Sequence, residues 1–475
     1  MTSSTETETP ASTPGRRLAR DIRDAIRGTS HDYTSGSVGR SIFLLAIPMV
    51  LEMVMESLFA LSDVFFVARV GASAVATVGL TESMMIVVYT LAMGLAIAGT
   101  AVVARRIGEK DADGAARAAV QVIVLGGIIA GGLSVLGALT APQLLRYMGA
   151  SADVLTTGTA FTRVLLGGSW TAFLLFVVNA TFRGAGDAAI SMRVLWLANA
   201  INIVLGPLLI FGPGPFPALG VTGAAIATTI GRGTGLMYAL WQLFRGRGRV
   251  RIARRHWHLE PATMLHMLRM SFNGTFQVLV GSLSWIVLVR LMAAFGSAAM
   301  AGYTIAVRMV MFAMLPAWGL GNAAATLVGQ ALGARDPDRA ERAVWTAARY
   351  NVAFLGLMGL VFVLAAPAIV HGFTHDPAVV DVGVYGLRVL ALAFPLSAFG
   401  MVLTQSFNGA GDTSTPTRIN IGVFWLFELP VAWAFATHTA LGYRGIFVAI
   451  TAAYSVLAGV STLMFRRGRW RTHRV

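Results

Sequence analysis

The chain has 475 residues, of which 56% are hydrophobic and 12% are charged, and its mean hydropathy is +0.69. A soluble domain has about 25% charged residues, so this composition is typical of a polytopic membrane protein. The chain contains no cysteine, which excludes disulfides, thiolate catalysis and cysteine metal sites. Its formal charge of +15 comes almost entirely from arginines between apolar runs, which indicates loop charge in a membrane protein and not a nucleic-acid surface.

Two different segments precede the first apolar run. Residues 1–15 are rich in Thr, Ser and Glu and are predicted to be disordered. They lack the apolar core of a signal peptide, so the first hydrophobic run is expected to be retained. In residues 16–27, Leu18, Ile22 and Ile26 recur at helical spacing beside arginines. This pattern predicts either a short helix on an anionic membrane leaflet or a solvated, charged tail.

The first apolar run, 41–71, is long enough to span a bilayer, yet it carries three acids and Pro48. At about 100° per residue, Glu52, Glu56 and Asp63 fall within roughly 40° of one another and form a stripe about 16 Å long. Acids inside a membrane helix are costly and usually face a cavity that serves transport, so the stripe predicts a proton or cation site. The alternative is that one or more of these acids lies at the water interface or pairs with an arginine.

Twelve apolar spans are predicted, and an even number places both termini on the same side of the membrane. Arginines cluster in the two terminal segments and after spans two, six and eight, and Arg183 follows span four. The opposite loops hold little more than Arg69, Arg146 and Arg444. By the positive-inside rule, both termini are expected in the cytoplasm, and the location is expected to be the bacterial inner membrane. The predicted spans are 41–66, 75–103, 116–140, 153–180, 191–212, 220–244, 264–291, 298–327, 343–370, 381–406, 416–437 and 444–465.

The two halves of the chain repeat. FRGAGD (182–187) follows span four and FNGAGD (407–412) follows span ten, an offset of 225 residues that predicts equivalent tight turns. The same offset aligns Gly71, Gly94 and Gly108 with Gly296, Gly319 and Gly333. Six spans in each half give parallel repeats, which commonly form two lobes around a central cavity. The predicted domains are a disordered and basic cytoplasmic tail (1–40), an N-terminal lobe with the cation site (41–244), a basic linker (245–262), a C-terminal lobe (263–465) and a basic tail (466–475).

The repeat breaks at the acid stripe. Its three acids align with Gln277, Gly281 and Leu288 in the second half, so ionisable chemistry is predicted in the N-terminal lobe only. Glu428 in span eleven is the main exception. Arg290 and Arg308 either meet this acid or cap helices at the outer face.

Five segments resemble the multidrug and toxic compound extrusion (MATE) transporters: LAIPMVLE, LSDVFFVARVGASAVATVGL, GLAIAGTAVVARRIGEKD, FRGAGDA and INIVLGPLLIFGPGPFPALGVTGAAIAT. The resemblance covers essentially residues 40–465 and is greatest to the DinF-like branch. It implies an all-α fold of twelve transmembrane helices in two six-helix bundles that form a V. It also implies a secondary active efflux antiporter, not an enzyme, which exports amphiphilic or cationic organic compounds in exchange for H⁺ or Na⁺ and needs no cofactor.

The resemblance implies roles for individual residues. Asp63 matches the first-helix aspartate that binds the coupling cation, and Pro48 matches the proline at which that helix bends. Protonation is expected to change this bend and expel substrate outward. Asn202 and Thr228 match polar residues of the fifth and sixth helices in the same cluster, and Asn179 would line the N-lobe cavity. Further candidates for the cavity lining are Met53, Met55, Phe59, Glu82, Met84 and Met85, although such residues also serve ordinary packing and lipid contact.

The sequence departs from the branch pattern at Gly206, where a second aspartate is usual. Either the coupling site is weaker, or Glu52 or Glu56 replaces the missing acid, with Glu82 behind them. Na⁺ needs several oxygen ligands, and the loss of one favours H⁺ as the coupling ion. Na⁺ at Asp63 is the alternative, and no other metal is expected.

The sequence is less consistent with two rival functions. A lipid-linked oligosaccharide flippase of related architecture would be expected to have a strongly cationic central cavity, with basic residues recurring within its spans. Here the acids of the first span are expected to dominate the intramembrane charge, in one lobe only. A membrane enzyme is disfavoured because the sequence has no Ser/His/Asp set and no HExxH motif. The expected partners are small organic substrates and the lipid bilayer, with no nucleic acid, and a monomer is expected.

Overall fold

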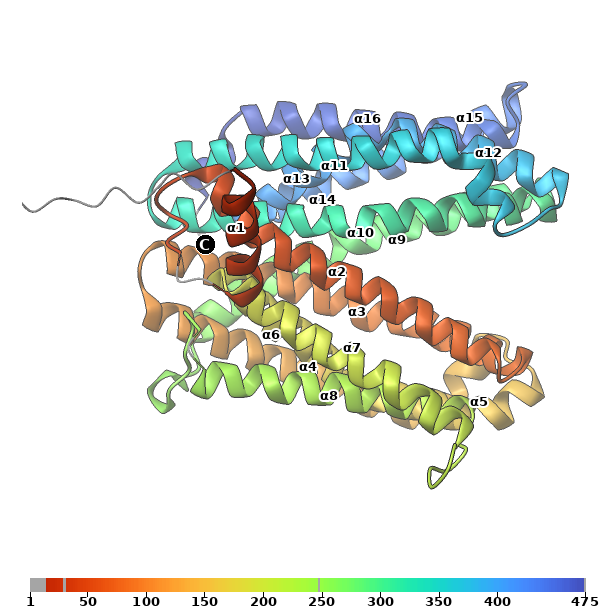
Figure 1. The fold of residues 1–475 in the computed structure, drawn as a ribbon, viewed down its shortest axis with the longest axis horizontal. Helices are drawn as coiled ribbons and strands as arrows, with labels where there is room; N and C mark the ends of the chain where they lie inside the picture. The colour runs from red at the N-terminus through yellow and green to blue at the C-terminus, as the bar shows by residue number, and fades with distance from the viewer. Residues whose placement is uncertain (1–13, 29–30, 247, 474–475) are drawn as a thin grey trace, which may run out of the picture.

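The computed structural model describes residues 14–28, 31–246 and 248–473. Within them every regular element is helical, which confirms the predicted all-α membrane fold. The long helices form two groups, which lie close together at the end that carries α1 and the C-terminus and diverge toward the other end (Figure 1). Residues 1–13 of the predicted tail lie outside the described residues.

The two groups of helices are the two halves of the chain. The N-terminal lobe consists of α2 (Val38–Ala68), α3 (Ala72–Gly108), α4 (Ala112–Tyr147), α5 (Ala152–Gly167), α6 (Ser169–Ala185), α7 (Ala188–Phe211) and α8 (Val221–Arg245). The C-terminal lobe consists of α9 (Pro261–Ala293), α10 (Ser297–Gly333), α11 (Pro337–His371), α12 (Pro377–Leu392), α13 (Phe394–Gly409), α14 (Ser414–Asn420), the π-helix η2 (Ile421–Glu428), α15 (Leu429–His438) and α16 (Tyr443–Arg466). Outside the lobes lie α1 (Pro14–Arg27) and two short 3₁₀ turns, η1 (Arg254–His256) and η3 (Arg469–Thr472).

The predicted spans correspond to these helices. Among the described residues, ten helical segments are long and apolar enough to cross a membrane, and α12 with α13 forms an eleventh that is bent by 53°. The helix α8, with 25 residues, occupies the place of the predicted sixth span. Twelve spans in two bundles are therefore consistent with the structure.

Two of the predicted spans are broken at repeat-related positions. Span 153–180 is α5 and α6, which meet at Gly168, where an added Cβ would collide with the Thr229 side chain of α8. The equivalent break, 225 residues later, separates α12 from α13 at Ala393. Pro395 follows this break and cannot donate a backbone hydrogen bond, which explains why a single helix does not continue.

Repeat-related glycines let the two lobes approach closely. Gly94 of α3 lies against α9, and Gly319 of α10 lies against α2, so the second helix of each lobe crosses the first helix of the other. Gly108 and Gly333 end α3 and α10 and lie against each other's helices. An added Cβ at any of these four positions would collide with backbone atoms of the opposite lobe. The glycines that the repeat singled out therefore serve the contact between lobes.

The segment 31–36, between α1 and α2, connects the lobes at the end where they converge. From the linker after α8, Arg249 donates to a carbonyl of this segment and lies over the Tyr33 ring, 4.6 Å from its centroid. From α11 of the other lobe, the Arg339 guanidinium donates to three carbonyls of the same segment at 2.6, 2.8 and 3.0 Å. The lobes can therefore separate at this end only if these contacts break.

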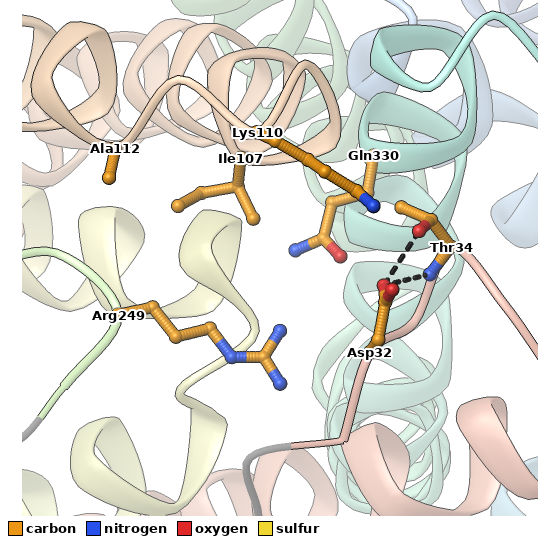
Figure 2. Close-up of a pocket in the computed structure, with 7 residues that line it drawn as sticks. All are labelled: Asp32, Thr34, Ile107, Lys110, Ala112, Arg249 and Gln330. Atoms are coloured by element: carbon orange, nitrogen blue, oxygen red, sulfur yellow. Dashed lines mark hydrogen bonds between the residues drawn. The ribbon is translucent and has the colours of Figure 1, made fainter.

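A hollow of about 350 Å³ lies beside this segment (Figure 2). Lys110 from the α3–α4 turn, Gln330 from α10 and Arg249 line it together with Asp32. The backbone N–H and the hydroxyl of Thr34 donate to the Asp32 carboxylate at 2.9 and 2.6 Å, and these hydrogen bonds lower the pKa of Asp32. Residues of both lobes thus surround the hollow.

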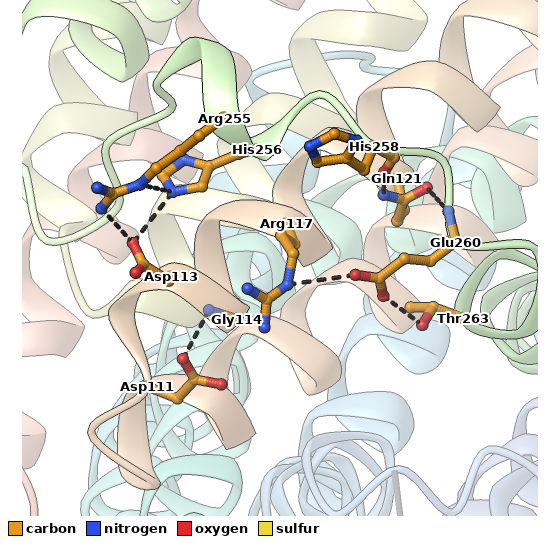
Figure 3. Close-up of polar contacts among 10 residues, drawn as sticks. All are labelled: Asp111, Asp113, Gly114, Arg117, Gln121, Arg255, His256, His258, Glu260 and Thr263. Carbon is orange, nitrogen blue, oxygen red and sulfur yellow. Dashed lines mark hydrogen bonds and ion pairs between the residues drawn. The ribbon is translucent and has the colours of Figure 1, made fainter.

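Residues 255–260 of the linker lie along the first turns of α4 (Figure 3). Asp113 accepts hydrogen bonds from Arg255 at 2.7 Å and from His256 at 3.0 Å, and Arg117 forms an ion pair with Glu260 at 3.2 Å. Asp113 therefore balances part of the linker's basic charge, and both contacts attach the linker to the N-terminal lobe before α9 begins.

Candidate cation-coupling site

The first acid of the stripe, Glu52, is fully buried and paired. Its side chain is 1% exposed. One carboxylate oxygen lies 2.8 Å from Nη1 of Arg183 at the end of α6, and the other accepts a hydrogen bond of 2.8 Å from the Ser191 hydroxyl of α7. The sequence had placed Arg183 among the loop charges, whereas the structure places it in the last turn of α6 with an 11% exposed side chain. The Arg183 guanidinium thus compensates the charge of Glu52.

Glu56 forms an ion pair with a different arginine, Arg232. Nη2 of Arg232, on α8, lies 2.5 Å from its Oε1, and the Asn199 amide of α7 donates to its Oε2 at 3.0 Å. The Arg232 side chain is 3% exposed, and its guanidinium lies over the Phe59 ring, 5.0 Å from the centroid. Sequence reasoning missed Arg232, although an arginine in the middle of a predicted span is itself a signal that an acidic partner lies nearby.

For Glu52 and Glu56, these contacts agree with the second interpretation of the stripe. Both acids pair with arginines, which was the alternative to a free proton or cation site. Removing one partner of such a buried pair costs about 3–5 kcal/mol, because the remaining charge stays buried without compensation. Neither acid is available as an uncompensated carboxylate in this state.

Asp63 differs from the other two acids. Within the described residues its carboxylate has neither an ion pair nor a hydrogen bond. It lies about two turns beyond Glu56 along α2, half-buried, and the neighbouring charge is the carboxylate of Glu82 on α3. Tyr89 of α3, another residue that sequence reasoning missed, lies within electrostatic range of Asp63, Glu82 and Glu56. Asp63 and Glu82, which have no basic partner among the described residues, therefore lie further from α1 than Glu52 and Glu56 do.

The predicted polar pair of α7 and α8 is formed. The Asn202 amide donates to the Thr228 hydroxyl at 2.8 Å, and the Asn202 side chain is buried. Four residues further along α7, a Cβ added at Gly206 would meet no atom within 4 Å. The position of the missing aspartate is thus open space, with no other side chain in its place.

The predicted cavity residues fall into two groups. Asn179, Met55 and Met85 are buried, and the Asn179 side-chain oxygen has no hydrogen-bond partner among the described residues. The other predicted lining residues, which are Met53, Phe59 and Met84 (half-buried) and Glu82 (exposed), retain accessible surface.

Pro48 lies inside α2, whose helix is continuous from Val38 to Ala68. Because it has no N–H, Pro48 leaves the carbonyl four residues earlier without its helical partner.

Among the described residues, the most deeply buried acid of the C-terminal lobe is Glu428. Glu428 is 2% exposed and ends the π-helix η2. Among the described residues no arginine pairs with it, so Arg290 and Arg308 are not its partners in this state. Pro430 follows two residues later, and a π-helical stretch before a proline accommodates the hydrogen bond that the proline cannot make.

Comparison with known sequences identifies the family. The MatE family matches residues 48–208 and 275–434, one copy in each lobe and more than half of the chain in total. The chain belongs to the MatE family. As a MATE protein it is a membrane transporter and not an enzyme. The two copies also agree with the repeat that the sequence indicated.

Individual MATE relatives match nearly the whole chain. The "Probable multidrug resistance protein NorM" of Thermotoga maritima is 25% identical over 443 residues, which are 92% of this chain and 94% of the relative. The "FAD transporter" of Shewanella oneidensis is 24% identical over 429 residues, 88% of this chain and 92% of the relative. A structure described as the outward-facing conformation of a multidrug resistance MATE transporter has a TM-score of 0.86 and 27% identity, and covers 92% of this chain and 97% of its own.

Proposed function

We propose that this MATE protein is a secondary active efflux antiporter that exports amphiphilic or cationic organic compounds in exchange for H⁺, with Asp63 as the coupling residue. The observation that carries the proposal is the contrast within one helix. Glu52 and Glu56 are neutralised by Arg183 and Arg232, whereas Asp63 has no basic partner among the described residues. An acid that must gain and lose a proton during each cycle needs this freedom from a permanent counter-ion.

The same contacts support H⁺ over Na⁺. Na⁺ prefers several oxygen ligands, and the position of one, Gly206, carries no side chain. Glu56 is already occupied by the Arg232 guanidinium, whose fixed positive charge repels a second cation in the same lobe. A proton needs only one carboxylate, so it is the ion that the remaining groups suit best.

Two features support an outward-facing state with both termini in the cytoplasm. Arginines concentrate at the end where the lobes converge, and positive charge marks the cytoplasmic side of a membrane protein. The contacts of the segment 31–36 with Arg249 and Arg339 hold that end together. Transport then requires these contacts to open while the opposite end closes, with α2 bending at Pro48.

Ion-gradient assays in proteoliposomes test this function. With the protein reconstituted and an ethidium-like cation as substrate, uphill transport is expected to follow an imposed pH gradient and not a Na⁺ gradient. Asp63→Asn is expected to abolish it, and Arg388→Gln, an exposed position of the other lobe, serves as the matched control. Uphill transport driven by Na⁺ alone, or full activity in Asp63→Asn, would refute the proposal. Including flavin adenine dinucleotide as a second substrate tests whether the chemistry named for the Shewanella relative applies here.

A further inference from the structure

A hollow of about 610 Å³ lies at the arginine-rich end of the N-terminal lobe. It lies between the end of α1, the start of α7 and the end of α8. Four arginines line it: Arg27 ends α1, Arg193 lies near the start of α7, Arg245 ends α8, and Arg249 follows in the linker. Neither the acid stripe nor the Asn202–Thr228 pair belongs to this hollow.

The hollow carries uncompensated positive charge. Asp187 is its one acidic lining residue, and its carboxylate serves Arg249, through the backbone N–H at 2.6 Å and the Nε at 3.7 Å. Among the described residues, no carboxylate pairs with Arg27, Arg193 or Arg245. Nε of Arg193 donates to a carbonyl of its own helix at 3.0 Å, and its two Nη groups have no hydrogen-bond acceptor among the described residues. Three guanidinium groups around one hollow therefore lack an anionic partner among the described residues.

The surroundings of the hollow place it at the membrane interface. Trp241 of α8 lines it, is 52% exposed and stacks on Tyr238, and exposed aromatic rings of this kind mark the headgroup level of a bilayer. The neighbouring helix α1 runs across the direction of the long helices (Figure 1). Its apolar residues Leu18, Ile22 and Ile26 are exposed, as expected of a helix that lies in the plane of the interface.

We propose that this hollow binds the phosphate headgroup of an anionic phospholipid from the cytoplasmic leaflet. This inference rests on the proposed orientation, in which the arginine-rich end faces the cytoplasm. Guanidinium groups bind phosphate oxygens in pairs of parallel hydrogen bonds, and basic pockets between transmembrane helices on the cytoplasmic side suit such headgroups. The acyl chains would lie along Trp241 and the apolar face of α1. A zwitterionic lipid fits less well, because its ammonium group would meet the same arginines.

The repeat supplies a matched control. Arg418 stands 225 residues after Arg193, at the equivalent place of α14, and is exposed. It has no carboxylate partner among the described residues, but it does not line the hollow. Arg418→Gln therefore removes one similar exposed arginine without touching the proposed site, whereas the double variant Arg193→Gln/Arg245→Gln removes two of the three free guanidinium groups.

The test is lipid binding to the full-length protein in detergent, measured by native mass spectrometry and by the shift in melting temperature. Phosphatidylglycerol is compared with phosphatidylcholine and with soluble glycerol phosphate. Wild type and Arg418→Gln are expected to retain phosphatidylglycerol and to be stabilised by it more than by the other two compounds. At about fivefold in affinity per arginine, the double variant is expected to bind phosphatidylglycerol about 25-fold more weakly.

Three results would overturn the proposal. These are unchanged phosphatidylglycerol binding in the double variant, an equal loss in Arg418→Gln, and equal stabilisation by soluble glycerol phosphate, which would indicate a soluble anion. The variant Arg193→Lys/Arg245→Lys keeps the charges and loses the paired geometry, so it is expected to fall between wild type and the Gln variant and guards against misfolding of the latter. Because binding is measured without transport, the result is independent of Asp63.

Discussion

The Glu56–Arg232 pair predicts how each partner behaves when the other is removed. Nη2 of Arg232 lies 2.5 Å from Oε1 of Glu56, and the two side chains are 3% and 25% exposed. Breaking a buried pair costs about 3–5 kcal/mol. Glu56→Gln leaves the more deeply buried charge alone, so we expect the upper part of this range for it. Arg232→Gln leaves a partly hydrated carboxylate, and we expect about 3 kcal/mol.

The double variant Glu56→Gln/Arg232→Gln leaves no unpaired charge, so its free energy of unfolding is expected to fall by only about 1–2 kcal/mol. The assay is chemical denaturation in detergent followed by tryptophan fluorescence, combined as a double-mutant cycle. We expect an interaction energy above about 2 kcal/mol. The exposed pair Arg444–Asp381, with side chains 46% and 61% exposed, is the control and is expected to give less than about 1 kcal/mol. Additive effects of the two N-lobe substitutions, within about 0.5 kcal/mol, would refute the reasoning.

Three further predictions follow from single contacts. Gly206→Asp faces open space and adds a carboxylate one turn from the Asn202–Thr228 pair, so it is expected to fold and to introduce Na⁺-dependent transport, and pure H⁺ dependence in this variant would contradict the ligand argument. Arg339→Gln removes three hydrogen bonds to the segment 31–36, each worth about 1 kcal/mol. In this cysteine-free chain, the substitution should increase thiol labelling of an added Thr34→Cys. Unchanged labelling would show that these bonds do not hold the end closed. Gly108→Val collides with the α10 backbone and should abolish folded protein, judged by gel filtration, whereas Gly79→Val, with no atom within 4 Å, should be tolerated.

Much of the fold could be predicted because it depends on patterns that are continuous along the chain. Apolar length located the spans, and the offset of 225 residues located the equivalent glycines at which the lobes touch. The two Gly-Ala-Gly-Asp motifs do form tight turns, with Gly186 at φ 84° and Gly411 at φ 88°, a left-handed conformation that glycine adopts without strain. The family resemblance placed Asn202 and Thr228 in one polar cluster with Asp63. The two residues form a hydrogen bond, and among the described residues no hydrogen bond joins Asp63 to them.

The ion pairs could not be predicted, because they join residues that are far apart in the sequence. Glu52 and Arg183 are separated by 131 residues, and Glu56 and Arg232 by 176. Periodicity shows that the three acids share one face of α2, but it does not show which neighbouring helix each acid meets, or at what depth. Counting Arg183 with the loop charges was wrong for this reason. An arginine at the edge of a span can belong to the interior as well as to the surface.

Proton release on substrate binding tests the role of Asp63 most directly. In weakly buffered detergent solution with a pH-sensitive dye, substrate added to the wild-type protein is expected to release about one proton per bound molecule, because proton and substrate exclude each other in an antiporter. Asp63→Asn resembles the protonated acid, so it is expected to bind substrate more weakly and, at a saturating substrate concentration, to release no proton. The double variant Glu56→Gln/Arg232→Gln is expected to release them as wild type does. Proton release that persists in Asp63→Asn, or that disappears only when Glu56 is replaced, would contradict the assignment of Asp63 as the coupling residue.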